Sequence, residues 1–201
     1  MPESSYSALA DRLLTIAYDI TATSGPAALS LREVQRRAGV SAATAYWHYK
    51  GRADLLLAVS RRATAKLADT LNDAITQPLP SRTSDLAAVC LAYMHFARDH
   101  EGLFQAIVMN SSTEELTHPA ESARGKAGLA AFEVLQRAVA DYTPEAGTGS
   151  PIGNAALHVW AACHGLAVLL IDSPMAGWPE SDKEQLRLQH VQFVLNSLSR
   201  H

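Results

Sequence analysis

Apolar residues recur along the chain with a helical period. Leu9, Leu13, Ile16 and Ile20 form the first stripe, which ends before the Gly-Pro pair at 25–26. Similar stripes cover residues 86–97, 102–109, 129–139, 154–171 and 188–198. No segment alternates between apolar and polar residues as a half-buried strand does. The pattern therefore predicts an all-α fold.

Two short helices are predicted between residues 30 and 48. Ser30 and Glu33 form a capping box that starts the first helix, and Gly39 suits the left-handed residue that ends it. Ser41 caps the second helix, which has the sequence AATAYWH. A short helix, a tight turn containing glycine and a second short helix give the outline of a helix-turn-helix.

A long helix follows, because the apolar pattern runs from Arg52 without a breaker as far as Pro78 and Pro80. The overall net charge is −3, but residues 1–66 hold nine Lys and Arg against five Asp and Glu, whereas residues 67–201 hold eight against fifteen. A basic segment on an acidic chain is typical of a protein that presents only that segment to nucleic acid. We therefore predict a three-helix helix-turn-helix domain at 1–66, joined by the long helix to a helical domain at 67–201.

The last two predicted helices indicate a homodimer. The helix at 154–171 is apolar on almost every side, and the final helix, for which Ser181 and Glu184 form a second capping box, has an apolar face of its own. One subunit cannot easily bury both, whereas a two-fold axis lets the same pair of helices cover itself. The alternative is that the helix at 154–171 forms the centre of a monomer core.

The sequence lacks the features of membrane and disulfide-rich proteins. Its longest apolar run, at 165–171, is too short to span a bilayer, and the N-terminus has no signal-peptide pattern. We therefore expect a cytoplasmic protein with no membrane partner. Cys90 and Cys163 are far apart in sequence and are interpreted as small core residues.

Neither an enzyme nor a cofactor-binding protein is indicated. His95 with His100, and His158 with Cys163 and His164, have spacings that place side chains on different sides of a helix, and no acidic residue completes either set. No nucleophile with a base, phosphate-binding loop or carboxylate constellation stands out. The sequence predicts no catalytic site, no metal site and no cofactor.

Three segments resemble a known family. LSLREVQRRAGVSAATAYWHYKGRADLLLAV at 29–59 is similar to the helix-turn-helix signature of the TetR family of bacterial transcriptional regulators. AYMHFARDHEGLFQAIV at 92–108 and WAACHGLAVLL at 160–170 resemble one C-terminal subclass of that family, marked by a Trp and a His-Gly pair. The resemblance implies a homodimeric, ligand-responsive regulator, most often a repressor, of a palindromic double-stranded DNA operator. The alternative is a dimeric small-molecule-binding protein of the same fold that does not bind DNA.

The second helix of a helix-turn-helix enters the major groove, so its outward side carries the candidate DNA-binding residues. Helical geometry turns Val40, Ala45 and Tyr49 inward. The predicted DNA-binding residues face outward or follow the helix: Ser41, Ala42, Ala43, Thr44, Tyr46, Trp47, His48, Lys50 and Arg52. The resemblance implies the same roles for Thr44, Tyr46 and His48. Alanines at the helix tip offer no hydrogen bonds, which favours recognition by close fit, thymine methyl contact and DNA shape.

A ligand-responsive regulator also requires an effector pocket, for which the large side chains of the C-terminal domain are the candidates. The predicted ligand-binding residues are Tyr93, Met94, Phe104, Met109, Phe132, His158, Trp160 and Cys163. Such residues pack a core more often than they line a cavity, so only part of the set is expected to touch ligand. The mostly apolar set favours a small hydrophobic or aromatic effector.

Overall fold

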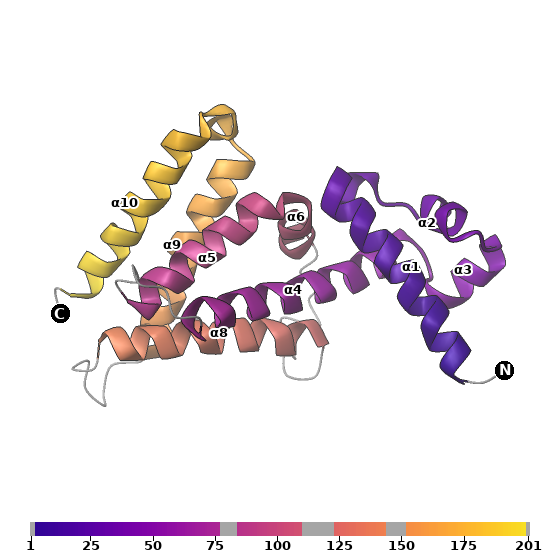
Figure 1. The fold of residues 1–201 in the computed structure, drawn as a ribbon, viewed down its shortest axis with the longest axis horizontal. Coiled ribbons are helices and arrows are strands. Elements are labelled where there is room, and N and C mark those ends of the chain that lie inside the picture. The colour runs from indigo at the N-terminus through magenta and orange to yellow at the C-terminus, as the bar shows by residue number, and fades with distance from the viewer. Residues whose placement is uncertain (1–2, 77–83, 110–122, 144–151, 200–201) are drawn as a thin grey trace. The chain divides into compact units, whose positions relative to one another are not determined.

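The computed structural model describes residues 3–76, 84–109, 123–143 and 152–199 (Figure 1). Every regular element in these ranges is helical, which confirms the predicted all-α class. The chain divides into two compact units, the first made of residues 1–64 and 100–125 and the second of residues 65–99 and 126–201. No helix of the described ranges is both long and apolar enough to span a membrane.

The first unit contains the helix-turn-helix. Its elements are α1 (Glu3–Ser24), the 3-10 turn η1 (Pro26–Ala28), α2 (Leu31–Ala38), α3 (Ala42–His48), the first half of α4 (Arg52–Thr76) and α6 (Glu101–Met109). One apolar core joins them, built on side chains such as Leu13, Val34, Ala45, Leu55 and Leu103. The predicted long helix from Arg52 is confirmed as the single helix α4.

The capping signals of α2 and α3 are confirmed. The Ser30 hydroxyl accepts a hydrogen bond from the Glu33 backbone N–H at 3.2 Å, and the Ser41 hydroxyl accepts one from the Thr44 N–H at 3.1 Å. Gly39, with φ of 65°, adopts the left-handed conformation that ends α2. These local signals set the turn that separates the two helices.

The second unit is a helical bundle. It contains the rest of α4, α5 (Asp85–Asp99), most of α8 (Ala123–Tyr142), α9 (Ile152–Ile171), η2 (Pro174–Gly177) and α10 (Glu180–Leu198). Helix α5 packs against both α9 and α10, and these two also contact each other (Figure 1). Buried aliphatic side chains from α4, α5, α8, α9 and α10 fill its interior.

The predicted capping box at the start of α10 is wrong. This helix begins at Glu180 after Pro179, and no side chain caps it. The carboxylate of Glu184 instead accepts hydrogen bonds from Arg187 at 2.9 Å and from Arg98 of α5 at 3.2 Å. The side chain of Arg187 is only 3% exposed, so a buried guanidinium outcompetes the helix terminus for this carboxylate.

Helix α6 lies unusually close to α1. Gly102, at the beginning of α6, is buried, and a Cβ atom placed on it would overlap the backbone carbonyl oxygen of Thr21. The same Cβ would lie 3.2 Å from the Cα of Gly25. Because both neighbours are backbone atoms, only glycine permits this approach.

The Gly102→Ala substitution should therefore destabilise the protein. We expect the free energy of unfolding to fall by about 1–3 kcal/mol, because α6 must shift away from α1. Gly128→Ala in α8 is the matched control, since nothing lies within 4 Å of a Cβ at that position. It should raise stability by up to about 1 kcal/mol, through helix propensity. Urea unfolding measures both, and equal effects would contradict the close packing of α6.

Candidate functional site

Helix α3 is held in the first unit by its inward side. Ala45 is completely buried, and Val40 and Tyr49 pack against the same core, as the helical geometry predicts. The Tyr49 hydroxyl also donates a hydrogen bond to the carbonyl oxygen of Ala10 in α1, at 3.3 Å. These contacts fix the orientation of α3 without using its outward side.

The outward side of α3 exposes small residues at its tip and two aromatic rings further along. Ala42 and Ala43 are exposed, and Tyr46 and Trp47 are 54% and 60% exposed. Burying a large apolar side chain stabilises a protein by about 2 kcal/mol, so neighbouring exposed rings on one short helix are costly to leave in water. Such a surface is typical of a site that contacts a partner.

Polar candidates flank these rings. The hydroxyls of Ser41 and Thr44 lie 2.7 Å apart on the exposed side of the α3 N-terminus. His48 is half-buried, and the centroid of its ring lies 5.2 Å from that of Trp47, edge to face. The Lys50 side chain is exposed, while its backbone N–H donates to the Asp54 carboxylate at 3.0 Å. Hydroxyl, imidazole and ammonium groups thus border the aromatic surface.

Arg52 makes contacts that the sequence did not reveal. Its guanidinium donates hydrogen bonds to the carbonyl oxygens of Leu29, at 3.1 Å, and Pro26, at 2.9 Å. These bonds tie the first turn of α4 to the connection between α1 and α2. A phosphate contact by Arg52 stays a prediction, but the side chain also has a structural role.

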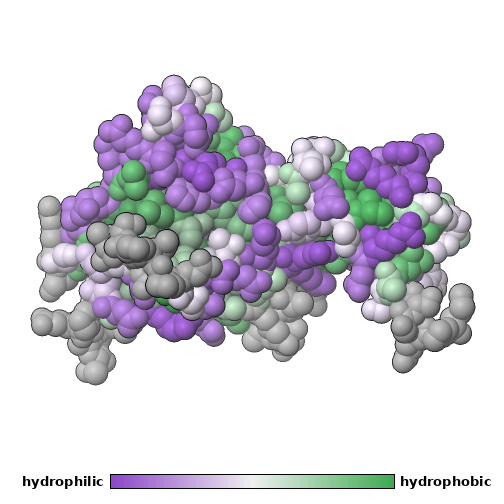
Figure 2. Space-filling view, viewed as in Figure 1, coloured by the Kyte–Doolittle hydropathy of each residue, from purple (hydrophilic) through white to green (hydrophobic). Residues whose placement is uncertain are grey.

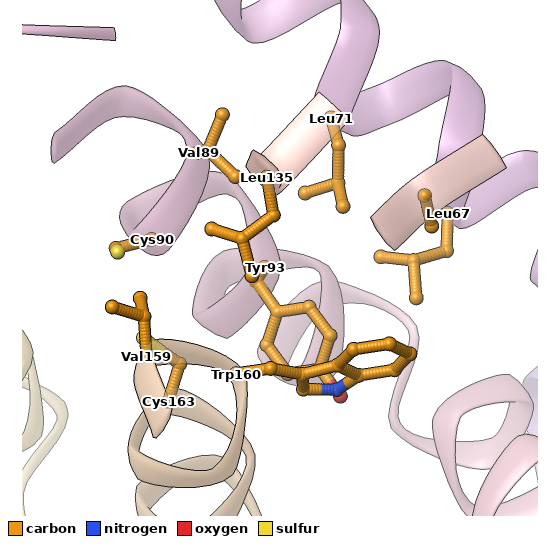
Figure 3. A pocket seen from close by; sticks show the side chains of 10 residues that line it. Leu67, Leu71, Val89, Cys90, Tyr93, Leu135, Val159, Trp160 and Cys163 are labelled. Atoms are coloured by element: carbon orange, nitrogen blue, oxygen red, sulfur yellow. The ribbon is translucent and has the colours of Figure 1, made fainter. Parts of the chain in front are cut away.

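The second unit encloses an apolar cavity (Figure 3). Its atom-free space, with its opening included, is about 360 Å³. Helices α4, α5, α8 and α9 contribute the lining residues Leu67, Leu71, Val89, Cys90, Tyr93, Ala131, Leu135, Val159, Trp160 and Cys163.

The predicted ligand-binding residues divide between the cavity and other places. Tyr93, Trp160 and Cys163 line the cavity, and the Phe132 ring packs against that of Trp160 with centroids 5.4 Å apart. The remaining four lie elsewhere: Met94 is in the core, Phe104 is buried in α6 of the first unit, and Met109 and His158 are exposed. The aliphatic lining from α4 and α8 was not predicted, because such residues carry no sequence mark that separates a cavity wall from a core.

Two polar side chains meet beside the cavity without net charge. The Tyr93 hydroxyl and Nδ1 of His164 share a hydrogen bond of 2.8 Å. Burial raises the pKa of Tyr93, and burial lowers the pKa of His164, so both groups are held in their neutral forms. The cavity therefore suits an uncharged molecule.

The two cysteines also meet at this cavity. Cys90 of α5 and Cys163 of α9 are both buried free thiols. Interaction with the Cys90 thiol, together with the nearby His190 imidazole, lowers the pKa of Cys163, although burial acts in the opposite direction. The same interaction, together with burial, raises the pKa of Cys90. Both thiols are buried among core residues, as the sequence analysis interpreted them.

Comparison with family models decides the affiliation of the chain. Residues 13–59 match the model of bacterial regulatory proteins of the TetR family, and residues 86–193 match that of the tetracycline repressor-like C-terminal domain. The chain belongs to the TetR family. Members of this family are non-enzymatic DNA-binding regulators, in agreement with the predicted absence of catalysis.

Solved structures share the whole fold of this TetR-family chain. A protein of unknown function from Rhodococcus sp. RHA1 is 27% identical, with a TM-score of 0.71 over 96% of this chain and 94% of that one. A TetR-family regulatory protein from Rhodococcus RHA1 is 18% identical, with a TM-score of 0.62 over 94% and 96%. The fatty acid degradation regulator FadR from Bacillus halodurans is 12% identical, with a TM-score of 0.66 over 92% and 94%. No match was found among curated proteins.

The structural role of Arg52 gives a prediction about stability. Replacing Arg52 with Met removes both hydrogen bonds to the carbonyls of Pro26 and Leu29, and should lower the free energy of unfolding by about 1–2 kcal/mol. Lys50→Met removes a neighbouring exposed cation and should change stability by less than about 0.5 kcal/mol. Thermal unfolding of the two variants provides the measurement. A loss of similar size in both would show that the Arg52 bonds are not stabilising.

Proposed function

We propose that this TetR-family protein is a cytoplasmic, ligand-responsive repressor that binds a palindromic operator as a dimer and leaves it when a small hydrophobic effector binds. The observation that carries the proposal is the exposed aromatic side of α3, in a segment with excess positive charge. Residues 1–66 are the proposed DNA-binding domain, and residues 67–201 the proposed effector-binding and dimerisation domain.

In this proposal α3 enters the major groove, whose width of about 12 Å admits one helix. Its tip residues Ala42 and Ala43 approach the base edges, where they contact thymine methyl groups and offer no hydrogen bond. The hydroxyl of Tyr46 and the ammonium of Lys50 then reach the backbone phosphates on either side. Recognition rests on close fit and DNA shape, so an operator with guanine contacts opposite the alanines would contradict it.

Exposed apolar residues on α9 and α10 support the proposed dimer. Leu157 and Leu169 of α9 are 54% and 45% exposed, and Leu188 and Phe193 of α10 are 52% and 67% exposed. The first turns of α10 are mainly hydrophilic in the view of Figure 2, so the apolar contact is proposed for the later turns. A two-fold axis would place the same surface of two subunits together, so that these residues would be covered in both subunits.

Two chain connections support coupling between effector and DNA. Helix α4 carries the cavity residues Leu67 and Leu71 and continues without a break to Arg52. Helix α5 carries the cavity residue Tyr93 and is followed after one residue by α6, whose Gly102 packs on α1. An effector that favours one placement of these helices therefore changes the spacing of two recognition helices in a dimer.

The role of Lys50 in phosphate binding is tested by salt dependence. Lys50→Ala should weaken binding to DNA from upstream of the gene, and should reduce the slope of log affinity against log salt by about 1. Arg137→Ala removes an exposed cation of α8, within the proposed effector-binding domain, and should leave the slope unchanged. Fluorescence anisotropy at several salt concentrations measures both.

The same assay distinguishes the proposed repressor from a small-molecule-binding protein that does not bind DNA. If the protein only binds small molecules, any affinity that it shows for DNA should not depend on salt. That affinity should also stay unchanged when Tyr46 and His48 are replaced by alanine. That result would contradict the repressor proposal.

The dimer is tested at its most exposed apolar residue. Phe193→Asp places a charge in the proposed interface and should convert dimers to monomers at micromolar concentration, because an unpaired buried carboxylate is strongly disfavoured. Ala130→Asp adds the same charge to an exposed position of α8 and should not change the mass. Sedimentation velocity gives the mass, and a Phe193→Asp dimer as tight as the unmodified one would place the interface elsewhere.

A further inference from the structure

The cavity of the second unit is walled by aliphatic, aromatic and thiol side chains. Its lining, in the described part of the chain, includes no Lys, Arg, His, Asp or Glu. Cys90 and Cys163 contribute buried thiols, which behave as small hydrophobic groups. A charged ligand would therefore find no side chain of opposite charge in these walls, and an unpaired buried charge is strongly disfavoured.

Two aromatic side chains form part of this wall. Tyr93 comes from α5 and Trp160 from α9, and in the view of Figure 3 Leu67 and Leu71 of α4 lie above both rings. A flat ring in the cavity can contact these two aromatic rings on one side and the leucines on the other. Aromatic pairs are stabilised beyond the area that they bury. The walls therefore favour an aromatic ligand over a saturated one of the same size.

The indole of Trp160 is supported from outside the cavity. Its ring packs against that of Phe132, with centroids 5.4 Å apart and planes inclined at 35°. Phe132 belongs to α8 and is not one of the lining residues. A side chain that is already packed loses little freedom when a ligand binds against it. Trp160 is therefore well placed to select for an aromatic ligand.

The hydroxyl in the cavity wall already has a hydrogen bond. The Tyr93 hydroxyl and Nδ1 of His164 are 2.8 Å apart, so a polar group on a ligand would have to compete with this bond. Apolar cavities with aliphatic and aromatic walls stay dry and bind benzene without any hydrogen bond. The atom-free space of about 360 Å³ includes the opening and is an upper limit, which favours a single ring with a short substituent.

We propose that the cavity binds uncharged monocyclic aromatic molecules, and that contact with the Trp160 ring selects them over saturated molecules of the same size. The inference rests on the proposed function, because it names the chemical class of the effector of the proposed repressor. Such a ligand needs no hydrogen-bond partner and leaves the bond between Tyr93 and His164 intact.

The first test compares four probes that share a six-membered ring, with the full-length protein and no DNA. Toluene is the expected ligand, methylcyclohexane is its saturated counterpart, and benzoate and benzylammonium carry the aromatic ring with opposite charges. Isothermal titration calorimetry at neutral pH should show that toluene binds about three- to tenfold more tightly than methylcyclohexane. Toluene should also bind at least about a hundredfold more tightly than either ion.

Three results of this comparison would overturn the proposal. The first is the absence of toluene binding. The second is an affinity for methylcyclohexane that equals the affinity for toluene, because the aromatic ring would then contribute nothing. The third is an ion that binds as tightly as toluene, because the cavity would then hold a charge.

Filling the cavity tests where toluene binds. Ala131 of α8 is 4% exposed and lines the cavity, so Ala131→Leu should lower the affinity for toluene by at least about tenfold. Ala130→Leu makes the same change at the neighbouring exposed position and should leave the affinity unchanged. Melting temperatures show whether the variants fold, and Ala131→Val, which adds less volume, is used if the leucine variant does not. Equal affinities at the two positions would place the site elsewhere.

Two substitutions at one position test the selective role of Trp160. Trp160→Phe keeps an aromatic ring and should keep the preference for toluene over methylcyclohexane. Trp160→Leu keeps an apolar side chain without a ring and should bring the ratio of the two affinities close to one. The ratio is the informative quantity, because general damage to the cavity lowers both affinities together. An undiminished ratio in Trp160→Leu would overturn the role of this ring.

Operator binding is measured separately, so that the two proposals can fail independently. If the ligand-free protein does not bind DNA from upstream of its gene, the repressor proposal fails, while the pattern of toluene binding still establishes the site. If it binds that DNA but not toluene, the repressor proposal stands and the inference about the cavity fails. Toluene should release the DNA at lower concentrations than methylcyclohexane does. Toluene binding that leaves the affinity for DNA unchanged would overturn its class as the effector.

Discussion

The exposed side of α3 depends on one constraint, which is that a helix as short as α3 is not stable in water by itself. The seven residues of α3 are helical because Ser41 caps their N-terminus and because Ala45 and Tyr49 are packed into the first unit. All of this stabilisation comes from the inward side and the two ends. The exposed residues Tyr46 and Trp47 lie outside this core, so their rings are accessible for contact with a partner.

The sequence predicted those features that local chemistry determines. Both caps of the helix-turn-helix, the inward position of Ala45 and the continuous helix α4 follow from the spacing of a few residues, and the structure confirms them. The predicted capping box at the start of α10 was wrong because Glu184 binds Arg187 and also His95, which lies 89 positions earlier in the chain. Ion pairs between distant segments compete with local capping, and no local pattern records that competition.

The cavity was predictable only in part for a related reason. A large side chain at a helical core position faces inward, but whether it meets atoms or empty space depends on how several helices are placed together. Met94 and Phe104 satisfied the same pattern as Tyr93 and became core residues. The presence of Cys90 and Cys163 at one cavity is equally a tertiary fact, since their positions on separate helices gave no sign of it.

The packing of Gly102 against Thr21 limits how the proposed regulation can work. The backbones of α6 and α1 are already in contact there, so α6 cannot move closer to α1. Only His100 separates α6 from α5, the helix that carries Cys90 and Tyr93 on the cavity wall. A rearrangement of α5 that moves the start of α6 must therefore either push α1 with it or break the contact. Close-packed backbones make these two outcomes discrete, and an effector needs to favour only one of them to change the affinity for DNA.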